Sequence, residues 1–468
     1  MNISYNKITP AIIKKITVIV GEDAVIINRA DLEKYSHDET EDLSYYPELV
    51  VKPNTTEQIA QLLKLCNEHL IPVTARGGGT GLTGGALPVA GGLLISMERF
   101  NHIIDIDGQS MQATVEPGVI TEVFMNAVAA KGMFYPIDPS SKGSCFLGGN
   151  VANGSGGPRV VKYGTIREYI LNLEVVLPSG DIIWTGSNTL KFASGYNLTQ
   201  LMIGSEGTLG IVTKIVTKLI PLPASNVLLM AAFSSNEDAC AAVSAIFRAG
   251  IVPSALEYME RNCIEWVKAY SGIHFDLKEN DAAFLLIEVD GSDNEVIFAQ
   301  CEKINLVLEE FGCKDTLFAD TSAQKAELWR IRRTIGESVK QHGVYKKEDT
   351  VVPRALLPQL VKGVKEVGDR YGFESVCFGH AGDGNMHINI IKGKMSDDDW
   401  KNKLDNAIAE IFEITVALGG TISGEHGIGL VQKQFLPIRY NEVHFELLRG
   451  IKKVFDKNNI LNPGKIFD

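Results

Sequence analysis

Two histidines bracket a glycine-rich stretch late in the chain, and their types and spacing could serve a metal ion. In GHAGDGNMH, residues 379–387, His380 and His387 flank Asp383 and Asn385. Both imidazoles would approach one point if the glycines bend the chain back or if a strand brings His387 beside His380. Farther along, GEHG supplies the adjacent pair Glu425 and His426. Two imidazoles and a carboxylate with open positions are the ligand set of a catalytic Zn, Mn or Fe(II) site. On spacing alone, a structural role for the histidines remains an equal interpretation.

A basic segment upstream of these histidines could bind an acidic substrate. LWRIRRTIGESVKQHGVYKKEDTVVPR, residues 328–354, begins as a helix and contains Arg332, Arg333, Lys346 and Lys347. Arginine suits a carboxylate because its planar fork makes two parallel hydrogen bonds. The same residues could equally form a solvated basic face, so the segment alone leaves both interpretations open.

Three glycine-rich loops in the first half of the chain could bind a long anion. They are RGGGTGLTGGALP (76–88), DPSSKGSCFLGGNVANGSGG (138–157) and GSEGTLGIVT (204–213). The first contains a formal GxGxxG, but a Rossmann site needs a helix directly after it, and Pro88 and the strand-like GGLLISM follow instead. Each loop could be only a tight turn between strands. Such loops also present bare backbone N–H groups to an anion, and three in one domain favour a ligand with a diphosphate.

The elements that must position these residues fall into two parts. A chain of 468 residues predicts two domains, and the glycine-rich first part ends at LIPLP, residues 219–223. In this part, TTEQIAQLLKLCNEHL (55–70) predicts a helix capped by Thr55 or Thr56, and LLISM and NLEVVLPSGDIIWTG predict strands. In the second part, VLLMAAFSS, AAFLLIEVDG and ESVCFGHAGDGNMHINIIKG predict strands, with amphipathic helices between them. The pattern is typical of α+β layers.

Composition excludes several classes of protein. The net charge of −12 argues against generic binding to nucleic acid or anionic membranes. No apolar run approaches the length of a membrane span, and the N-terminus lacks the pattern of a cleaved signal, so a cytoplasmic protein is expected. The seven cysteines are scattered without a CxxC, which predicts reduced core thiols and neither disulfides nor an iron-sulfur cluster.

The three loops, together with YG at 163–164 and the terminal NPGKIFD, resemble the FAD-binding domain of the PCMH-type (vanillyl-alcohol-oxidase) flavoproteins. The resemblance runs over nearly the whole chain. It is greatest to the branch of D-lactate dehydrogenases, glycolate oxidase flavin subunits and D-2-hydroxyglutarate dehydrogenases.

The resemblance implies an α+β fold in three ranges. Residues 1–222 would form a FAD-binding domain of two α+β subdomains, residues 223–422 an α+β cap for substrate and metal with an antiparallel sheet, and residues 423–468 a segment that returns to the FAD. Some members attach FAD covalently through a histidine in the first loop, where this chain has Thr80, so non-covalent FAD is expected. The residues implied to bind FAD are Arg76, Gly77, Gly78, Gly79, Thr80, Gly81, Gly84, Gly85, Pro136, Asp138, Ser144, Gly148, Gly149, Asn150, Asn153, Gly154, Gly157, Glu206, Gly210, Ile211, Val212 and Asn462.

GHxGDGNxHxN and EHG are the metal and active-site motifs of the same branch. They imply that His380, His387 and Glu425 bind a divalent metal, with Zn expected ahead of Mn or Fe, and that Asn389 lies close to the substrate. His426 would be the catalytic base. By the same resemblance, Arg332 and Lys347 bind the substrate.

The implied reaction is the oxidation of a D-2-hydroxy acid, such as D-lactate, glycolate or D-2-hydroxyglutarate, to the 2-oxo acid. The metal would lower the hydroxyl pKa, His426 would take the proton, and a hydride would pass to flavin N5. The hydroxyglutarate enzymes have a threonine four residues after the arginine that matches Arg332, where this chain has Gly336. Lactate or another short or apolar D-2-hydroxy acid is therefore expected as the substrate at least as strongly as D-2-hydroxyglutarate.

Other interpretations remain at this point. In a metal-dependent hydrolase, His380, His387 and Glu425 would activate water, the loops would be turns, and the protein would be colourless. The alkylglycerone-phosphate synthases resemble the chain weakly, but their run of consecutive histidines is absent. Because no cysteine cluster could carry electrons onward, the flavin of a dehydrogenase would need an acceptor: an electron-transfer flavoprotein, a quinone, an iron-sulfur subunit or oxygen. A homodimer is possible.

Overall fold

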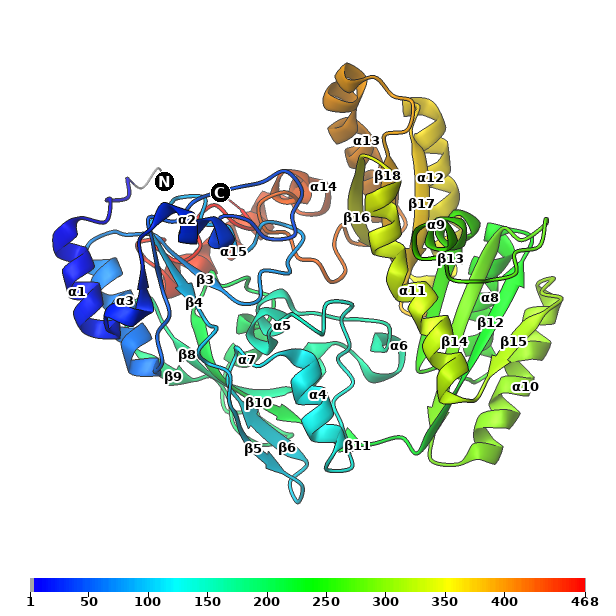
Figure 1. Ribbon diagram of the computed structural model, residues 1–468, viewed down its shortest axis with the longest axis horizontal. Coiled ribbons are helices and arrows are strands. Elements are labelled where there is room, and N and C mark those ends of the chain that lie inside the picture. Colours follow the sequence, from blue (N-terminus) through cyan, green and yellow to red (C-terminus); the bar gives the residue numbers. More distant parts are fainter. Residues whose placement is uncertain (1–3, 468) are drawn as a thin grey trace. The chain divides into compact units, whose positions relative to one another are not determined.

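The computed structural model describes residues 4–467, and the chain divides into two compact units. The first comprises Met1–Gly156, Thr165–Leu222 and Glu425–Asp468, and the second comprises Gly157–Gly164 and Pro223–Gly424. Figure 1 follows the chain through both by colour. These ranges differ from the sequence-based ones in two places: the segment Gly157–Gly164 packs in the second unit, and the returning C-terminal segment begins at Glu425.

The first sheet of the first unit has four strands in the order β1-β2-β4-β3. Strands β2 and β3 each pair parallel with β4, whereas β1 pairs antiparallel with β2. The helices α1 and α3 contribute to the same buried core as this sheet. Thr55 caps α3, since its side chain accepts a hydrogen bond from the N–H of Gln58. The bounds are β1 Val25–Ile26, β2 Leu49–Val51, β3 Val73–Arg76, β4 Leu93–Ser96, α1 Pro10–Val20, α2 Arg29–Leu32 and α3 Thr56–Glu68.

The second sheet of the first unit has five antiparallel strands in the order β5-β6-β10-β8-β9. A separate two-stranded ladder joins β7 to β11. Apolar side chains such as Leu173 and Val175 alternate along β8 and are fully buried. The bounds are β5 Ile103–Asp107, β6 Gln112–Val115, α4 Thr121–Ala129, β7 Met133–Phe134, α5 Leu147–Asn153, β8 Ile170–Val176, β9 Ile182–Trp184, α7 Leu198–Met202, β10 Ile211–Lys218, β11 Ile220–Pro221, α14 Leu436–Arg439 and α15 Glu442–Phe455.

The second unit is built on a seven-stranded sheet in the order β15-β12-β14-β13-β17-β18-β16, and every ladder in it is antiparallel (Figure 1). This confirms the antiparallel cap sheet. Helices α9 and α11 pack against one set of alternating strand residues. Helices α8, α10 and α12 also contact the sheet, and α13 packs on α12. The bounds are β12 Ser225–Phe233, α8 Asn236–Arg248, β13 Ala255–Glu260, α9 Arg261–Ser271, β14 Ala283–Gly291, α10 Asn294–Glu310, β15 Thr316–Ala319, α11 Ser322–His342, β16 Tyr345–Val351, α12 Leu357–Tyr371, β17 Glu374–Gly379, β18 Asn385–Ile391 and α13 Asp397–Ala417.

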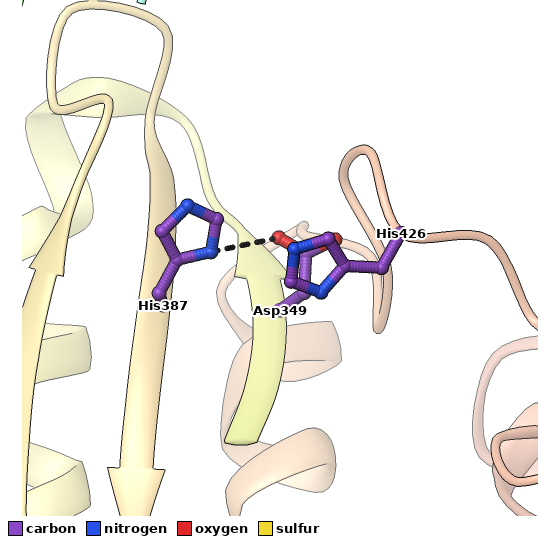
Figure 2. Close-up of side chains that lie close together, drawn as sticks. All are labelled: Asp349, His387 and His426. Atoms are coloured by element: carbon purple, nitrogen blue, oxygen red, sulfur yellow. Dashed lines mark ion pairs between the residues drawn. The ribbon is translucent and has the colours of Figure 1, made fainter. Parts of the chain in front are cut away.

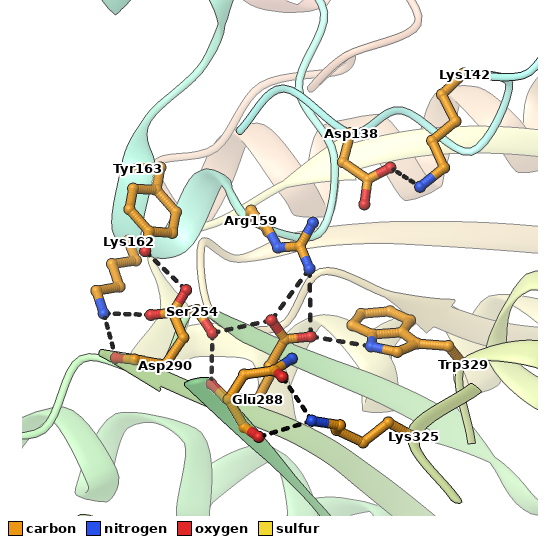
Figure 3. A network of polar contacts seen from close by, with 11 residues as sticks. Asp138, Lys142, Arg159, Lys162, Tyr163, Ser254, Glu288, Asp290, Lys325 and Trp329 are labelled. Carbon is orange, nitrogen blue, oxygen red and sulfur yellow. Dashed lines mark hydrogen bonds and ion pairs between the residues drawn. The ribbon is translucent and has the colours of Figure 1, made fainter. Parts of the chain in front are cut away.

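A polar network ties the segment Gly157–Gly164, which contains the short helix α6 (Val160–Tyr163), to β14 (Figure 3). Nη2 of Arg159 lies 3.1 Å from Oε1 of Glu288, whose other oxygen accepts the indole N–H of Trp329 at 2.9 Å. Asp290 accepts hydrogen bonds from the Lys162 ammonium and, at 2.7 Å, from the Tyr163 hydroxyl. These contacts to the buried carboxylates of Glu288 and Asp290 explain why the segment belongs to the second unit.

Two expectations from the sequence concern membrane segments and cysteines. Within residues 4–467, none of the helices is both long and apolar enough to cross a bilayer. All seven cysteines are free thiols in buried positions. The prediction that the cysteines lie in the core is therefore confirmed.

Candidate functional site

The three glycine loops converge within the first unit, although they are far apart in sequence. A Cβ atom added to Gly78 would lie 2.6 Å from the carbonyl oxygen of Ser144, and one added to Gly77 would lie 3.7 Å from Cα of Gly149. A Cβ at Gly85 would lie 3.8 Å from Oε2 of Glu206. The first loop therefore contacts both the second and the third.

The backbone of the first loop fits an anionic ligand. Among residues 4–467, no acceptor is found for the N–H groups of Gly77, Gly78, Gly79, Thr80 and Gly81. Consecutive N–H groups without internal partners form a concave anion-binding surface when glycines keep side chains out of the way. Gly149 of the second loop also has open space where a side chain would be. This chemistry fits the diphosphate of a dinucleotide such as FAD.

Several residues predicted to bind FAD have structural contacts of their own. A Cβ at Gly148 would overlap Pro117, and one at Gly210 would overlap Val175, so both glycines allow close packing. The Asn150 amide donates to the hydroxyl of Thr121 at 2.7 Å, and Asp138 pairs with Lys142 at 2.8 Å (Figure 3). Arg76 is buried at the end of β3 and donates to the carbonyl of Lys34. The other predicted residues of the first unit lie in or beside the same loops or begin β10, namely Gly84, Pro136, Asn153, Gly154, Ile211 and Val212, whereas Gly157 belongs to the second unit.

Glu206 holds the returning C-terminal segment in place inside the first unit. Its two carboxylate oxygens accept the N–H groups of Ile428 at 2.8 Å and Gly429 at 2.7 Å. Burial raises the pKa of Glu206, although these two hydrogen bonds oppose the increase. The carbonyl of His426 accepts hydrogen bonds from Thr83 at 3.2 Å and Asn153 at 3.5 Å. The backbone that carries Glu425 and His426 is therefore anchored to all three glycine loops.

The terminal NPGKIFD segment is also fixed by hydrogen bonds in the first unit. The Asn462 amide donates to the carbonyls of Gly85 and Glu206, both at 2.8 Å. The Lys465 ammonium donates to the carbonyl of Leu87 at 2.5 Å and to Asn462 Oδ1 at 3.2 Å. Burial lowers the pKa of Lys465 to about 8.

In the second unit, the hairpin of β17 and β18 brings His380 and His387 together, which meets the condition under which both rings can approach one point. His387 faces Phe378 across this ladder, and His380 directly follows β17. The two ring centroids are 5.3 Å apart, and one nitrogen of each ring lies within 4.8 Å of the other. The turn requires glycine at Gly384, whose φ is +86° and where a Cβ would overlap the carbonyl of Val352.

Each of these histidines has its Nδ1 atom near a buried carboxylate. The two oxygens of Glu257, on β13, lie 2.8 and 2.9 Å from Nδ1 of His380. Asp349, on β16, has Oδ1 3.5 Å from Nδ1 of His387 (Figure 2). Burial alone would raise the pKa of Glu257, but the charges and hydrogen bonds of His380 and Arg332 outweigh it and hold this pKa below its ordinary value. A carboxylate on Nδ1 orients an imidazole so that Nε2 can bind a metal, so this donor set fits a divalent ion.

Three more predicted residues lie near this hairpin, and the charged groups of two of them lie near the Phe378 ring. Arg332 is only 5% exposed, and its guanidinium carbon lies 4.9 Å from the centre of the Phe378 ring. Lys347 faces Asn389 across the β16–β18 ladder, and its ammonium lies 5.9 Å from that ring. The Asn389 amide donates to the carbonyl of Val376 at 3.1 Å. Arg332 therefore does not belong to a solvated basic face, whereas Arg333 is exposed.

Glu425 and His426 are the first two residues of the last segment of the first unit, directly after Gly424 of the second. Asp349 Oδ2 accepts the N–H of Gly424 at 2.9 Å and lies 3.3 Å from the Ser423 hydroxyl. Gly424, the residue directly before Glu425, is therefore hydrogen-bonded to Asp349, the carboxylate that lies near His387.

Sequence reasoning did not single out Glu257 or Asp349. Glu257 stands in the strand ALEYME, where an acidic residue in a wholly buried run is a signal that it has a partner. Asp349 stands in the polar stretch YKKEDTV, where one more acidic residue does not suggest a buried partner. Its partners, Asn385 on β18 and Gly424, are far away in the sequence.

Comparisons with known proteins agree with this geometry. Residues 47–186 match the family model described as FAD binding domain, and residues 222–466 match FAD linked oxidases, C-terminal domain. Glycolate oxidase subunit GlcD of Bacillus subtilis (strain 168) is 39% identical over 92% of this chain and 92% of its own length. D-lactate dehydrogenase of Anaerostipes hadrus is 37% identical over 99% of this chain and 98% of its own. The solved structure of p-cresol methylhydroxylase with substrate bound covers 100% of this chain and 99% of its own at 20% identity, with a TM-score of 0.80, which shows the PCMH-type fold.

Proposed function

The chain belongs to the FAD-linked oxidoreductases of the hydroxy-acid dehydrogenase family, and on that premise we propose that it oxidises a short D-2-hydroxy acid to the 2-oxo acid with the help of a divalent metal. The observation that carries the proposal is the pair of adjacent imidazoles, His380 and His387, each with Nδ1 at a buried carboxylate. A metal-dependent hydrolase would not use a flavin. The match to a FAD-binding domain therefore speaks against that alternative.

The first unit would bind FAD without a covalent bond. The N–H groups of Gly77 to Gly81 and the open backbone at Gly149 would face the diphosphate. Thr80 offers no imidazole for covalent attachment. Glu206 and Asn462 would act indirectly, since their side chains bond protein backbone and hold the loops together.

His380, His387 and Glu425 would hold the metal ion. Zn is the first expectation because imidazole and carboxylate donors suit it, and Mn or Fe(II) would fit the same set. When bound, the metal ion would lower the pKa of the substrate hydroxyl and FAD would accept the C2 hydride at N5.

The protein's own residues would position the acid and remove its proton. Arg332 would bind the substrate carboxylate, with Lys347 and Asn389 on the same face of the sheet beside it. His426 would take the hydroxyl proton as general base, because an imidazole titrates close to neutral pH. Its backbone is held by Thr83 and Asn153, which would keep the base in place during the reaction.

A short or apolar acid such as D-lactate or glycolate fits the substrate side better than D-2-hydroxyglutarate. Gly336 lies one helical turn after Arg332 on α11, and a Cβ there would meet no atom within 4 Å. The position thus offers no hydroxyl for a second carboxylate. The reduced flavin would pass its electrons to a separate acceptor such as an electron-transfer flavoprotein, a quinone or an iron-sulfur subunit.

The test is to mix FAD-loaded, metal-loaded protein anaerobically with D-lactate, L-lactate, glycolate and D-2-hydroxyglutarate in turn, and to follow the visible flavin absorbance. We expect D-lactate or glycolate to bleach the flavin. A chelator should abolish this bleaching, and added Zn²⁺ or Mn²⁺ should restore it. Bleaching that survives complete metal removal would contradict the metal's role. A flavin spectrum that no acid bleaches would contradict the substrate class.

A further inference from the structure

Glu257 is a fully buried carboxylate that contacts two proposed site residues at once. Its oxygens lie 2.8 and 2.9 Å from Nδ1 of His380. One of them, Oε2, accepts the Nε–H of Arg332 at 2.7 Å and lies 2.6 Å from Nη2 of the same side chain. These residues come from β13, the turn after β17, and α11. A single carboxylate is therefore shared by the ring proposed to bind metal and the guanidinium proposed to bind substrate.

Stability alone is a weak reason for such an arrangement. The desolvation cost of a buried ion pair often matches or exceeds its attraction, so apolar residues of similar size would serve a core equally well. A carboxylate on Nδ1 of a metal-binding histidine, by contrast, fixes the orientation of the ring. The hydrogen bond from Nε and the ion-pair contact at Nη2 likewise fix the guanidinium plane and turn its remaining N–H groups away from Glu257.

We infer that Glu257 is a positioning residue that couples the metal-binding edge of His380 to the carboxylate-binding edge of Arg332. The inference rests on the proposed function and adds a residue to it. Without the Glu257 charge, the His380 ring loses its orienting partner and the buried Arg332 loses the counter-charge that Glu257 supplies. Metal affinity and substrate KM then change together.

The experiment measures metal binding directly, apart from turnover. FAD-loaded protein is stripped with a chelator, and Zn²⁺ is returned in a calorimetric titration against a competing chelator. The test variant is Glu257→Gln, which keeps the side-chain size and removes the charge. The matched control is Glu288→Gln on the adjacent strand β14. Glu288 is also a buried, salt-bridged carboxylate, and among residues 4–467 it makes no hydrogen bond to His380 or Arg332.

The expected result is a Zn²⁺ affinity about 10- to 100-fold weaker in Glu257→Gln than in the wild type. This is the usual loss when a metal-binding histidine loses the group that hydrogen-bonds its other ring nitrogen. KM for the acid should rise as well, while Glu288→Gln binds Zn²⁺ like the wild type. Equal affinity in the wild type and Glu257→Gln would overturn the inference and leave the proposed metal site standing. A wild type that binds neither Zn²⁺ nor Mn²⁺ would overturn both the metal site and the inference.

A second variant covers the case in which Glu257→Gln does not fold, as judged by circular dichroism and thermal unfolding. Glu257→Asp keeps the charge but is shorter by one methylene, so it cannot reach His380 and Arg332 together. It should weaken Zn²⁺ binding in the same direction by a smaller factor. Wild-type affinity in folded Glu257→Asp, with wild-type KM, would overturn the coupling.

Discussion

Asp349 and His387 face each other across the ladder between β16 and β18, with Oδ1 of the carboxylate 3.5 Å from Nδ1 of the ring. Asp349 also accepts hydrogen bonds from the Asn385 amide at 2.6 Å and from the N–H of Gly424 at 2.9 Å. One buried carboxylate thus contacts the hairpin that carries the imidazoles and the residue that precedes Glu425.

Asp349→Asn should impair metal binding more than folding. An amide keeps the size of the side chain but loses the charge that orients His387, so we expect Zn²⁺ affinity to fall about 10- to 100-fold. Equilibrium dialysis of the FAD-loaded protein, with metal content read by elemental analysis, checks this. Unchanged metal content at limiting Zn²⁺ would contradict an orienting role for Asp349.

Arg332→Lys should raise KM for the acid at least about tenfold and leave flavin binding unchanged, because an ammonium cannot hold Glu257 and a carboxylate with the fork geometry of a guanidinium. Steady-state kinetics with the acid that bleaches the flavin gives KM and kcat separately. Arg333→Lys, at the exposed neighbour on α11, is the control and should behave like the wild type. An equal effect of both changes would contradict a specific role for the Arg332 guanidinium.

Glu206→Gln should loosen the segment that carries His426. A glutamine side chain has one acceptor oxygen, so either the part-buried N–H of Ile428 or the buried N–H of Gly429 would lose its partner, at a cost of roughly 1–3 kcal/mol. Denaturant unfolding measures that cost, and stopped-flow flavin reduction should show a slower rate with the wild-type spectrum. A normal reduction rate in a destabilised protein would mean that the anchor serves folding alone.

Two glycine substitutions should have opposite effects. Gly384→Ala adds a Cβ that overlaps the carbonyl of Val352 at a φ of +86°, so the free energy of unfolding should fall by at least about 3 kcal/mol. Gly336→Ala lies in α11 with no atom within 4 Å of the new Cβ, and should stabilise by about 0.5–1 kcal/mol. Thermal unfolding of both variants compares them. A tolerated alanine at position 384 would show that the turn can rearrange.

Lys465 should make the free energy of unfolding change with pH in the alkaline range. Its pKa falls from 10.5 in the unfolded chain to about 8 in the folded protein. Between these values the unfolded chain binds the extra proton, so the free energy of unfolding should rise with pH from about 8 to about 10.5, by at most about 3 kcal/mol. Lys465→Met should lack this rise. Denaturant unfolding at pH 7, 8, 9 and 10 gives the free energy of unfolding of both proteins. The same dependence on pH in both would contradict the lowered pKa of Lys465.

The sequence predicted local features well because they depend on nearby residues. The helix after Thr55 or Thr56 and the strands of the second unit follow from periodicity and caps. The antiparallel pairing of those strands is implied by the family resemblance, and the hairpin that brings His387 beside His380 meets a condition that the glycines left open. Glu257 escaped prediction because its bond to His380 joins residues 123 positions apart. The same holds for Arg159, whose partner Glu288 lies in another predicted domain. Pairing over such distances depends on strand order, which no local pattern encodes.

The segment Gly157–Gly164 affects how chimeras of this protein with its relatives can be built. The chain passes from one unit to the other after residues 156, 164, 222 and 424. A cap exchanged by recombination only at residues 222 and 424 would leave Arg159 and Lys162 beside a foreign β14, without an assured Glu288 and Asp290. A functional exchange must therefore graft this short segment along with the cap, and its sequence should vary together with that of β14 rather than with the residues that flank it.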